Sequence, residues 1–148
     1  MLVMCGNAVS KTNEEVNAVL EVGLDYTSFP AAIARFFLDG RKSLVVTGTH
    51  GKTTTTALLS WVLQASGKKP GFMGGGWLKN FDNNHQVQEG NYFVTEGDEN
   101  DRVFLDKGPK FLPYLPVASF MRGIDFIHAH LFTKLDHITA TSREYGRL

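Results

Sequence analysis

The chain has 148 residues, in which 15 Lys or Arg balance 15 Asp or Glu, and it has one cysteine, Cys5. This length is that of one domain, or of one domain with part of another. The zero net charge gives no reason to expect binding to nucleic acid or to an anionic membrane. A single cysteine excludes an intramolecular disulfide, and therefore a small secreted scaffold held together by disulfides.

The sequence also argues against export and membrane insertion. No apolar run approaches the ~18–20 residues that a membrane-spanning helix requires. The apolar run Leu2–Cys5 has no basic start and is too short for the core of a signal peptide. We therefore expect a cytoplasmic protein.

Strands and helices are predicted to alternate along the first half of the chain. Short apolar runs indicate strands, the first of them buried, and a capping box from Thr12 to Glu15 indicates a helix that ends at Gly23. Pro30 is placed to open a second helix, and a third follows Lys52. The expected elements are strands at 2–5, 25–28 and 41–47 and helices at 12–23, 30–40 and 52–67, with apolar faces formed by Ile33, Phe36 and Phe37 in the second helix and by Leu58, Leu59, Val62 and Leu63 in the third.

The second half of the chain is less regular. Residues 70–90 are rich in Gly and Asn, which predicts either a long functional loop or a short hairpin. Expected strands follow at 92–95 and 117–121, separated by an acidic stretch over 96–106, and 131–148 is expected to be helical. The alternation predicts an α/β fold in which helices cover both faces of a parallel sheet. The aromatic side chains expected to pack in its core are Phe36, Phe37, Phe93, Phe104 and Phe111, and Trp61 is expected to pack against the protein rather than to stack on a nucleotide.

The sharpest motif is Thr47-Gly48-Thr49-His50-Gly51-Lys52-Thr53-Thr54, between an expected strand and an expected helix. Glycines allow a tight turn that brings backbone amides against anionic oxygens, and the helix directs its positive end to the same place. Lys52 adds a charge toward the β- and γ-phosphates of a nucleotide, and the Thr53 hydroxyl can ligate Mg²⁺. The full Walker pattern needs glycine where this chain has Val46, so the alternative is a Gly-rich turn with a solvated lysine.

The shortened loop T-G-T-x-G-K-T-T resembles the ATP loop of the Mur ligases, the enzymes that build the peptide of bacterial cell-wall precursors. The similarity extends from about Leu2 to His137 and is weak beyond Pro116. Together the segments resemble the branch of the family that joins L-alanyl-γ-D-glutamyl-meso-diaminopimelate to UDP-N-acetylmuramate. The other segments that recur in the family's order are 6–9, 26–28, 74–75 with 80–81, 96–99, 101, 106–107 and 110–111.

The resemblance implies a parallel-sheet P-loop central domain, preceded by a partial Rossmann-like N-terminal domain. Residues 1–40 are then expected to be a remnant of the UDP-sugar-binding domain and 41–148 part of the ATP-binding domain, with the C-terminal domain absent. The implied reaction uses ATP and Mg²⁺ to join a peptide amine to the muramyl carboxylate through an acyl phosphate, as in peptidoglycan recycling. We expect this chain to bind ATP but to be inactive in ligation by itself.

The resemblance also implies roles for individual residues. Glu96 ends an expected strand, where ligands gather in open parallel sheets, and the family's glutamate at this position binds Mg²⁺. The implied ATP-binding residues are Gly48, Thr49, His50, Gly51, Lys52, Thr53 and Thr54. The implied catalytic residues are Lys52, Glu96 and His128, the metal ligands are Thr53, Glu96 and His128, and the substrate residues are Asn80 and Phe81. Asp98 and Glu99 are weaker candidates, because alternating carboxylates after a strand often form a solvated loop.

The segment around His128 departs from the family. Gly123 stands where an asparagine is usual, Ile127 where an aspartate is usual, and His130 where an acid is usual. These departures leave the second metal site open, and His128 with His130 can alternatively form a transition-metal pair on one face of a strand.

Two other functions remain open on sequence alone. One is a non-catalytic nucleotide-binding module, in which the phosphate loop is retained without turnover. The other is a small P-loop kinase or NTPase, which predicts a lid with paired arginines. The sparse arginines in the second half of the chain, at 102, 122, 143 and 147, give this option little support.

Overall fold

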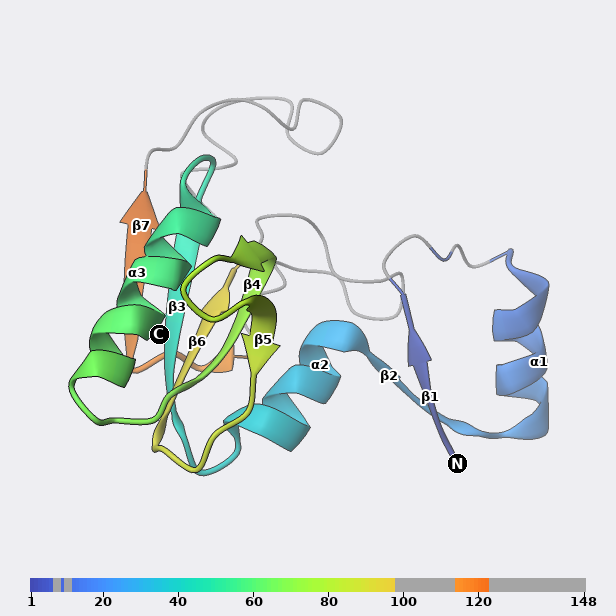
Figure 1. The fold of residues 1–148 in the computed structure, drawn as a ribbon. Coiled ribbons are helices and arrows are strands. Elements are labelled where there is room, and N and C mark those ends of the chain that lie inside the picture. Colours follow the sequence, from blue (N-terminus) through green and yellow to red (C-terminus); the bar gives the residue numbers. More distant parts are fainter. Residues whose placement is uncertain (7–8, 10–11, 98–113, 123–148) are drawn as a thin grey trace.

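The computed structural model of the chain describes residues 1–6, 9, 12–97 and 114–122. Most of the described residues belong to a five-stranded sheet with helices against it, and a smaller unit lies to one side (Figure 1). None of the described helices is both long and apolar enough to cross a membrane. Phe104, Phe111 and the helix expected at 131–148 lie outside the described residues.

The five-stranded sheet has the order β5-β4-β6-β3-β7. Its strands are β3 (Lys42–Gly48), β4 (Gly71–Leu78), β5 (Asn83–Gln86), β6 (Tyr92–Glu96) and β7 (Ala118–Arg122). β3 runs parallel to both of its neighbours, β6 and β7, and β4 runs parallel to β6. β5 is antiparallel to β4, so the Gly- and Asn-rich region contains a hairpin, and the alternative of a long loop was wrong.

Side chains of β3 alternate between two apolar clusters, one on each face of the sheet. Leu44 and Val46 pack with Phe72 and Val94 beneath α3 (Lys52–Ala65). On the other face, Val45 packs with side chains from α2 (Phe29–Ile33) and from the π-helical segment η1 (Ala34–Leu38) that continues it. The prediction of an α/β fold with helices on both faces of a mainly parallel sheet is therefore confirmed.

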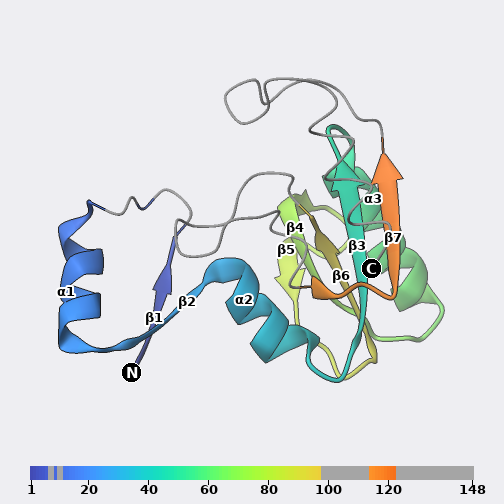
Figure 2. The same cartoon turned by 180° about the vertical axis from the view of Figure 1, so that it is seen from behind.

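The N-terminal strands form a sheet of their own. Among the described residues, β1 (Leu2–Cys5) pairs only with β2 (Asp25–Ser28), in parallel, and α1 (Glu14–Val22) lies between them in the chain (Figure 2). Leu2 is 40% exposed and Met4 is 55% exposed, whereas Cys5 is buried. The strand was predicted correctly, but its burial was not, because a two-stranded sheet has too few neighbours to cover both faces of β1.

Both N-terminal helices begin at polar caps that differ slightly from the prediction. The cap of α1 is Asn13, whose Oδ1 accepts hydrogen bonds from the amides of Glu15 (2.8 Å) and Val16 (3.2 Å). The capping box starting at Thr12 was therefore wrong by one residue. In α2, the hydroxyl of Ser28 accepts from the amide of Ala31 (3.3 Å), and the helix starts one residue before Pro30.

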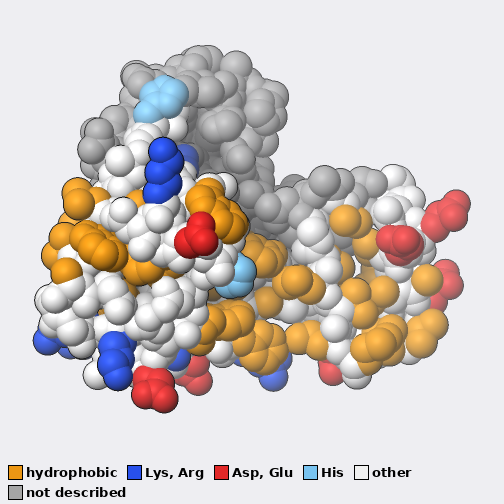
Figure 3. Space-filling model, viewed as in Figure 1, with side chains coloured by type: hydrophobic (Ala, Val, Ile, Leu, Met, Phe, Trp, Pro, Cys, Tyr) orange, Lys and Arg blue, Asp and Glu red, His pale blue; other side chains and the backbone are white. Residues whose placement is uncertain are grey.

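The apolar faces of two helices also differ from the prediction. Phe37 packs against Phe93, but Phe36 is 56% exposed and lies under the guanidinium of Arg35. In α3, Leu59 and Leu63 contact the core as expected. Its fully buried residues are instead Thr56 and Ser60, whereas Leu58 and Val62 are exposed, and Figure 3 shows hydrophobic side chains on the surface in this region.

Candidate functional site

The loop between β3 and α3 has a backbone that requires glycine at two positions. Gly48, the last residue of β3, has φ 115°, and Gly51, the N-cap of α3, has φ 76°. Both values lie in the region that side-chain-bearing residues rarely adopt. These two residues bring the chain from the carboxyl end of β3 into the first turn of α3 within three intervening positions.

The first turn of α3 supplies positive charge and hydrogen-bond donors. No side chain caps this helix, which is 14 residues long, so the amides of its first turn point toward the loop. The Nζ of Lys52 donates a hydrogen bond to the carbonyl oxygen of Gly48 (2.7 Å), which holds the ammonium group across the loop. Lys52, Thr49 and Thr53 are half-buried, and His50 and Thr54 are exposed. The loop is therefore a compact cationic turn at the carboxyl end of the parallel strands.

Glu96 lies at the same end of the sheet as the loop, where the parallel strands β3 and β6 finish. β6 is the direct neighbour of β3, and Glu96 is in register with Val46, two residues before Gly48. The amide of Gly97 donates to the carbonyl oxygen of Val46 (2.8 Å), which extends the pairing to the end of the strand. The Glu96 carboxylate accepts a hydrogen bond from the amide of Gly75 at Oε1 (2.7 Å). This last contact was not predicted, although the run of three glycines in β4 is a signal of close backbone approach.

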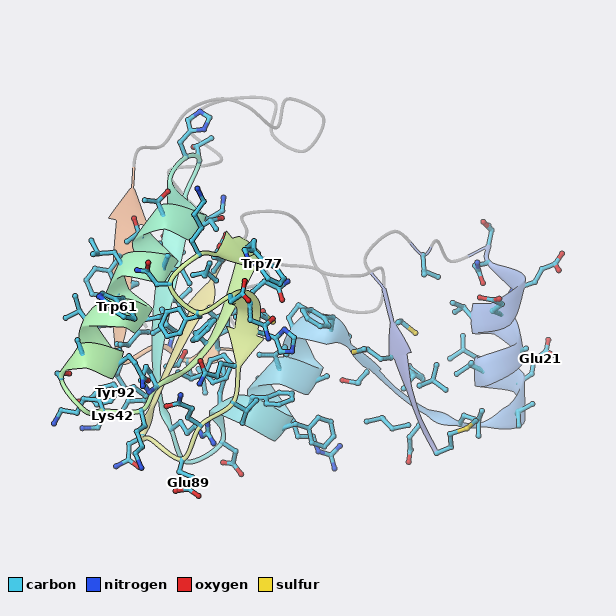
Figure 4. All side chains as sticks on the ribbon, in the orientation of Figure 1. Glu21, Lys42, Trp61, Trp77, Glu89 and Tyr92 are labelled. Carbon is cyan, nitrogen blue, oxygen red and sulfur yellow. The ribbon has the colours of Figure 1, made fainter. Side chains whose placement is uncertain are left out.

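Asn80 and Phe81 follow β4 and differ in exposure. The ring of Phe81 is half-buried and packs against Phe72, with 4.3 Å between ring centroids, and against Trp61 at 5.8 Å. Asn80 is exposed beside it. Trp61 lies on the outer part of α3 (Figure 4), where it packs on Phe81 as expected. Of the two predicted substrate residues, Asn80 is the one whose side chain is available to a ligand.

The structure therefore brings Lys52, Thr53 and Glu96 to one edge of the sheet. The other candidates for metal binding, His128, His130, Asp98 and Glu99, lie outside the described residues. Within 1–6, 9, 12–97 and 114–122, no group of three or more His, Cys, Asp or Glu side chains converges on a point. A cage built only from protein ligands is thus absent from this part of the chain.

The residues present fit a magnesium–nucleotide complex. Mg²⁺ is usually held by one or two carboxylates, phosphate oxygens of the substrate and several waters. Glu96 can supply a carboxylate, Thr53 a hydroxyl, and the loop amides with Lys52 can hold the phosphates. No described side chain other than these is needed for that arrangement.

Two cavities elsewhere in the molecule are lined by side chains of other kinds. One of about 460 Å³ is lined by Lys42, Lys68, Lys69 and Tyr92 and lies at the opposite end of β3 from the loop (Figure 4). The other, of about 370 Å³, is mostly apolar and lies between α2 and the β4–β5 hairpin. Neither cavity is lined by the glycine loop or by Glu96, so the carboxyl end of β3 at Gly48–Thr53 is the candidate site.

Comparison with known proteins relates the chain to the Mur ligases. The Mur ligase middle domain family matches residues 46–104. The chain is 40% identical over 147 residues to the UDP-N-acetylmuramate–L-alanyl-gamma-D-glutamyl-meso-2,6-diaminoheptandioate ligase of Escherichia coli (strain K12), covering 99% of the chain and 32% of that relative. The enzyme of the same name from Haemophilus influenzae is 42% identical, with the same coverage.

A solved structure shows the same fold. The crystal structure of UDP-N-acetylmuramate:L-alanyl-gamma-D-glutamyl-meso-diaminopimelate ligase (MPL) from Neisseria meningitides superposes with a TM-score of 0.88 at 35% identity, and the match covers 95% of this chain and 46% of that one. The chain spans about a third of the length of the curated relatives it matches.

Proposed function

Because the chain belongs to the Mur ligase family and matches its middle domain, we propose that it supplies the ATP-binding site of an ATP-dependent amide-bond ligase. The proposed substrates of the whole enzyme are UDP-N-acetylmuramate and L-alanyl-γ-D-glutamyl-meso-diaminopimelate, the two compounds in the names of the similar ligases. We propose that the enzyme acts in the cytoplasm, in the recycling of cell-wall peptides.

The proposed reaction has two steps. An oxygen of the muramyl carboxylate attacks the γ-phosphorus of ATP, the bond to the β-phosphate oxygen breaks, and ADP leaves. The peptide amine then attacks the carbonyl carbon of the acyl phosphate, an amide forms, and phosphate and a proton are released. Phosphoryl transfer of this kind depends mainly on positioning and on stabilisation of developing charge.

The residues of this chain have defined parts in that reaction. The amides of the loop and the first turn of α3 hold the phosphates, and Lys52 offsets the negative charge that develops on them. Thr53 and Glu96 hold Mg²⁺, which neutralises phosphate charge when it is bound. We keep His128 as a proposed ligand and Asn80 with Phe81 as proposed parts of the muramyl site. The observation that carries the proposal is the register that places Glu96 beside the glycine loop.

The N-terminal unit has its own place in this proposal. Residues 1–40 are proposed to be part of the UDP-sugar-binding domain, and 41–148 part of the ATP-binding domain. The separate two-stranded sheet of β1 and β2 supports an N-terminal unit, because it shares no strand with the five-stranded sheet, whereas α2 and η1 pack against the five-stranded sheet. The peptide amine would be recognised by residues beyond the described segments.

Calorimetry with a non-hydrolysable ATP analogue and Mg²⁺ tests the proposal. We expect Lys52→Ala to weaken binding at least tenfold, because a hydrogen bond to a charged group contributes about 1.5–3 kcal/mol. Lys68→Ala is the matched control, since Lys68 is exposed and lies at the opposite end of β3 from the loop. Equal affinity for wild type and Lys52→Ala would remove the loop from the nucleotide site.

A further inference from the structure

The middle of β4 contains three consecutive glycines, Gly74, Gly75 and Gly76, which have no role in the proposed reaction as described above. β4 pairs with β6 up to Met73 and Thr95, so the glycine run begins where Glu96 ends the neighbouring strand. None of the three has a positive φ, and a tight turn is therefore not the reason for glycine here. The reason must lie in the space around the backbone.

That space is occupied by the Glu96 carboxylate. Its Oε1 accepts a hydrogen bond from the amide of Gly75 (2.7 Å). A Cβ atom added to Gly75 would lie 3.1 Å from Oε2 and 3.5 Å from the carboxyl carbon. The carboxylate thus lies directly against the Gly75 backbone, at a distance that is tighter than most contacts of a real Cβ.

Gly76 has a different neighbour. A Cβ atom there would meet the methyl group of Thr53 at 3.4 Å, which is an ordinary van der Waals contact. A Cβ atom at Gly74 would lie 3.6 Å from Oε1, which is also an ordinary contact, so the tight contact with the carboxylate is at Gly75, and Gly76 provides a matched comparison one residue away.

We propose that Gly75 is a positioning residue for the magnesium site, which rests on the proposed function. Its amide holds Oε1, so that Oε2 keeps one orientation and remains available to the metal, and the missing Cβ allows the carboxylate to lie this close. Carboxylates that bind metals are commonly oriented by such hydrogen bonds, and loss of the orienting group typically lowers metal affinity about 10–100-fold. Gly75 itself contacts neither metal nor nucleotide in this proposal.

The experiment measures how binding of a non-hydrolysable ATP analogue depends on Mg²⁺ concentration, in the 148-residue chain. We expect Gly75→Ala to raise the Mg²⁺ concentration needed for half-maximal enhancement about 10–100-fold, with unchanged affinity for the analogue in EDTA. Gly76→Ala should change that concentration less than threefold. Glu96→Gln, which keeps an oxygen acceptor but removes the charge, should abolish the enhancement.

The outcomes separate this inference from the proposed function. If Glu96→Gln abolishes the Mg²⁺ enhancement but Gly75→Ala behaves as the wild type, the role of Gly75 is wrong and the metal site stands. If wild type and Glu96→Gln are equally insensitive to Mg²⁺, the proposed metal site itself is wrong. If Gly75→Ala weakens binding in EDTA as much as in Mg²⁺, Gly75 has only a structural role and the inference is overturned.

A measurement that does not depend on the Gly75→Ala variant folding is amide hydrogen exchange followed by NMR. We expect the Gly75 amide proton to exchange at least tenfold more slowly in the wild type than in Glu96→Ala, because the carboxylate is its acceptor. Equal exchange rates in the two proteins would overturn the inference.

Discussion

Thr56 and Ser60 bury their hydroxyl groups on the inner side of α3. Both side chains are fully buried, and neither hydroxyl has a hydrogen-bond partner among the described residues. A buried hydroxyl without a partner is unfavourable by about 1–3 kcal/mol, because it loses its hydrogen bonds to water. These residues therefore lower the stability of the helix that carries the phosphate loop.

We expect Thr56→Val to raise the free energy of unfolding by about 1 kcal/mol, since valine keeps the shape of threonine without the hydroxyl. Denaturant unfolding followed by circular dichroism measures the change. The matched control is Thr54→Val, which is exposed on the same helix and should change stability by less than about 0.5 kcal/mol. A loss of stability in Thr56→Val would show that the hydroxyl has a partner, such as an internal water.

At this scale the sequence predicted which residues gather at the edge of the sheet, but not how their side chains contact one another. The strand ending at Glu96 and the loop before Lys52 were both visible as patterns. The hydrogen bond from Gly75 to Glu96 joins residues 21 positions apart, and such a pairing depends on strand order, which periodicity does not encode.

The phase of α3 illustrates why a helix can be predicted while its buried face is not. Apolar spacing placed Leu58 and Val62 inward, but both are exposed. Thr53, Thr56 and Ser60 are spaced so that they lie on one face of the helix. The face that carries Thr53 at the loop is therefore the face that is buried farther along the helix. Because the loop sets where Thr53 points, it also sets which later residues of the helix are buried.

The connection between β5 and β6 passes very close to the connection between α3 and β4. The amide of Gly90 donates to the carbonyl oxygen of Lys69 (3.0 Å), and a Cβ atom at Gly90 would collide with the carbonyl oxygens of Lys68 and Lys69. Backbone atoms cannot move aside as a flexible side chain can. Glycine is therefore required here for close approach of two chain segments.

We expect Gly90→Ala to lower the free energy of unfolding by about 1–3 kcal/mol, as overpacking commonly does. Thermal and denaturant unfolding measure the loss. Gly6→Ala is a suitable control, because a Cβ atom at Gly6 meets nothing within 4 Å. If the two variants are equally stable, the two connections do not pack as closely as described.

At the scale of the whole molecule, the alternation of strands and helices predicted the class of fold, and the structure confirms it. The alternation did not predict that β3 lies between β6 and β7, or that the N-terminal strands form a separate sheet. Strand order results from packing between distant segments. The same apolar pattern within each strand is compatible with several different strand orders, so the pattern does not select one of them.

We expect the 148-residue polypeptide to bind ATP but not to ligate the peptide to UDP-N-acetylmuramate. It spans about a third of the relatives' length, and orientation of both reactants contributes as much as ~7–11 kcal/mol to such reactions. Mass spectrometry after incubation with ATP, Mg²⁺ and both substrates detects any product. Turnover at the rate of a full-length relative would show that these residues are sufficient for catalysis.

The central place of β3 has a consequence for how the chain is made. Leu44 pairs with Ala118, and Lys42 with Tyr92, so β3 leaves the ribosome long before either neighbour. At ~5–20 residues per second, the 74 positions from Leu44 to Ala118 take ~4–15 s to synthesise. During that time the apolar stretch Leu44–Val46 has no strand beside it on the β7 side. Chaperones that bind exposed apolar segments during synthesis should therefore increase the yield of soluble protein.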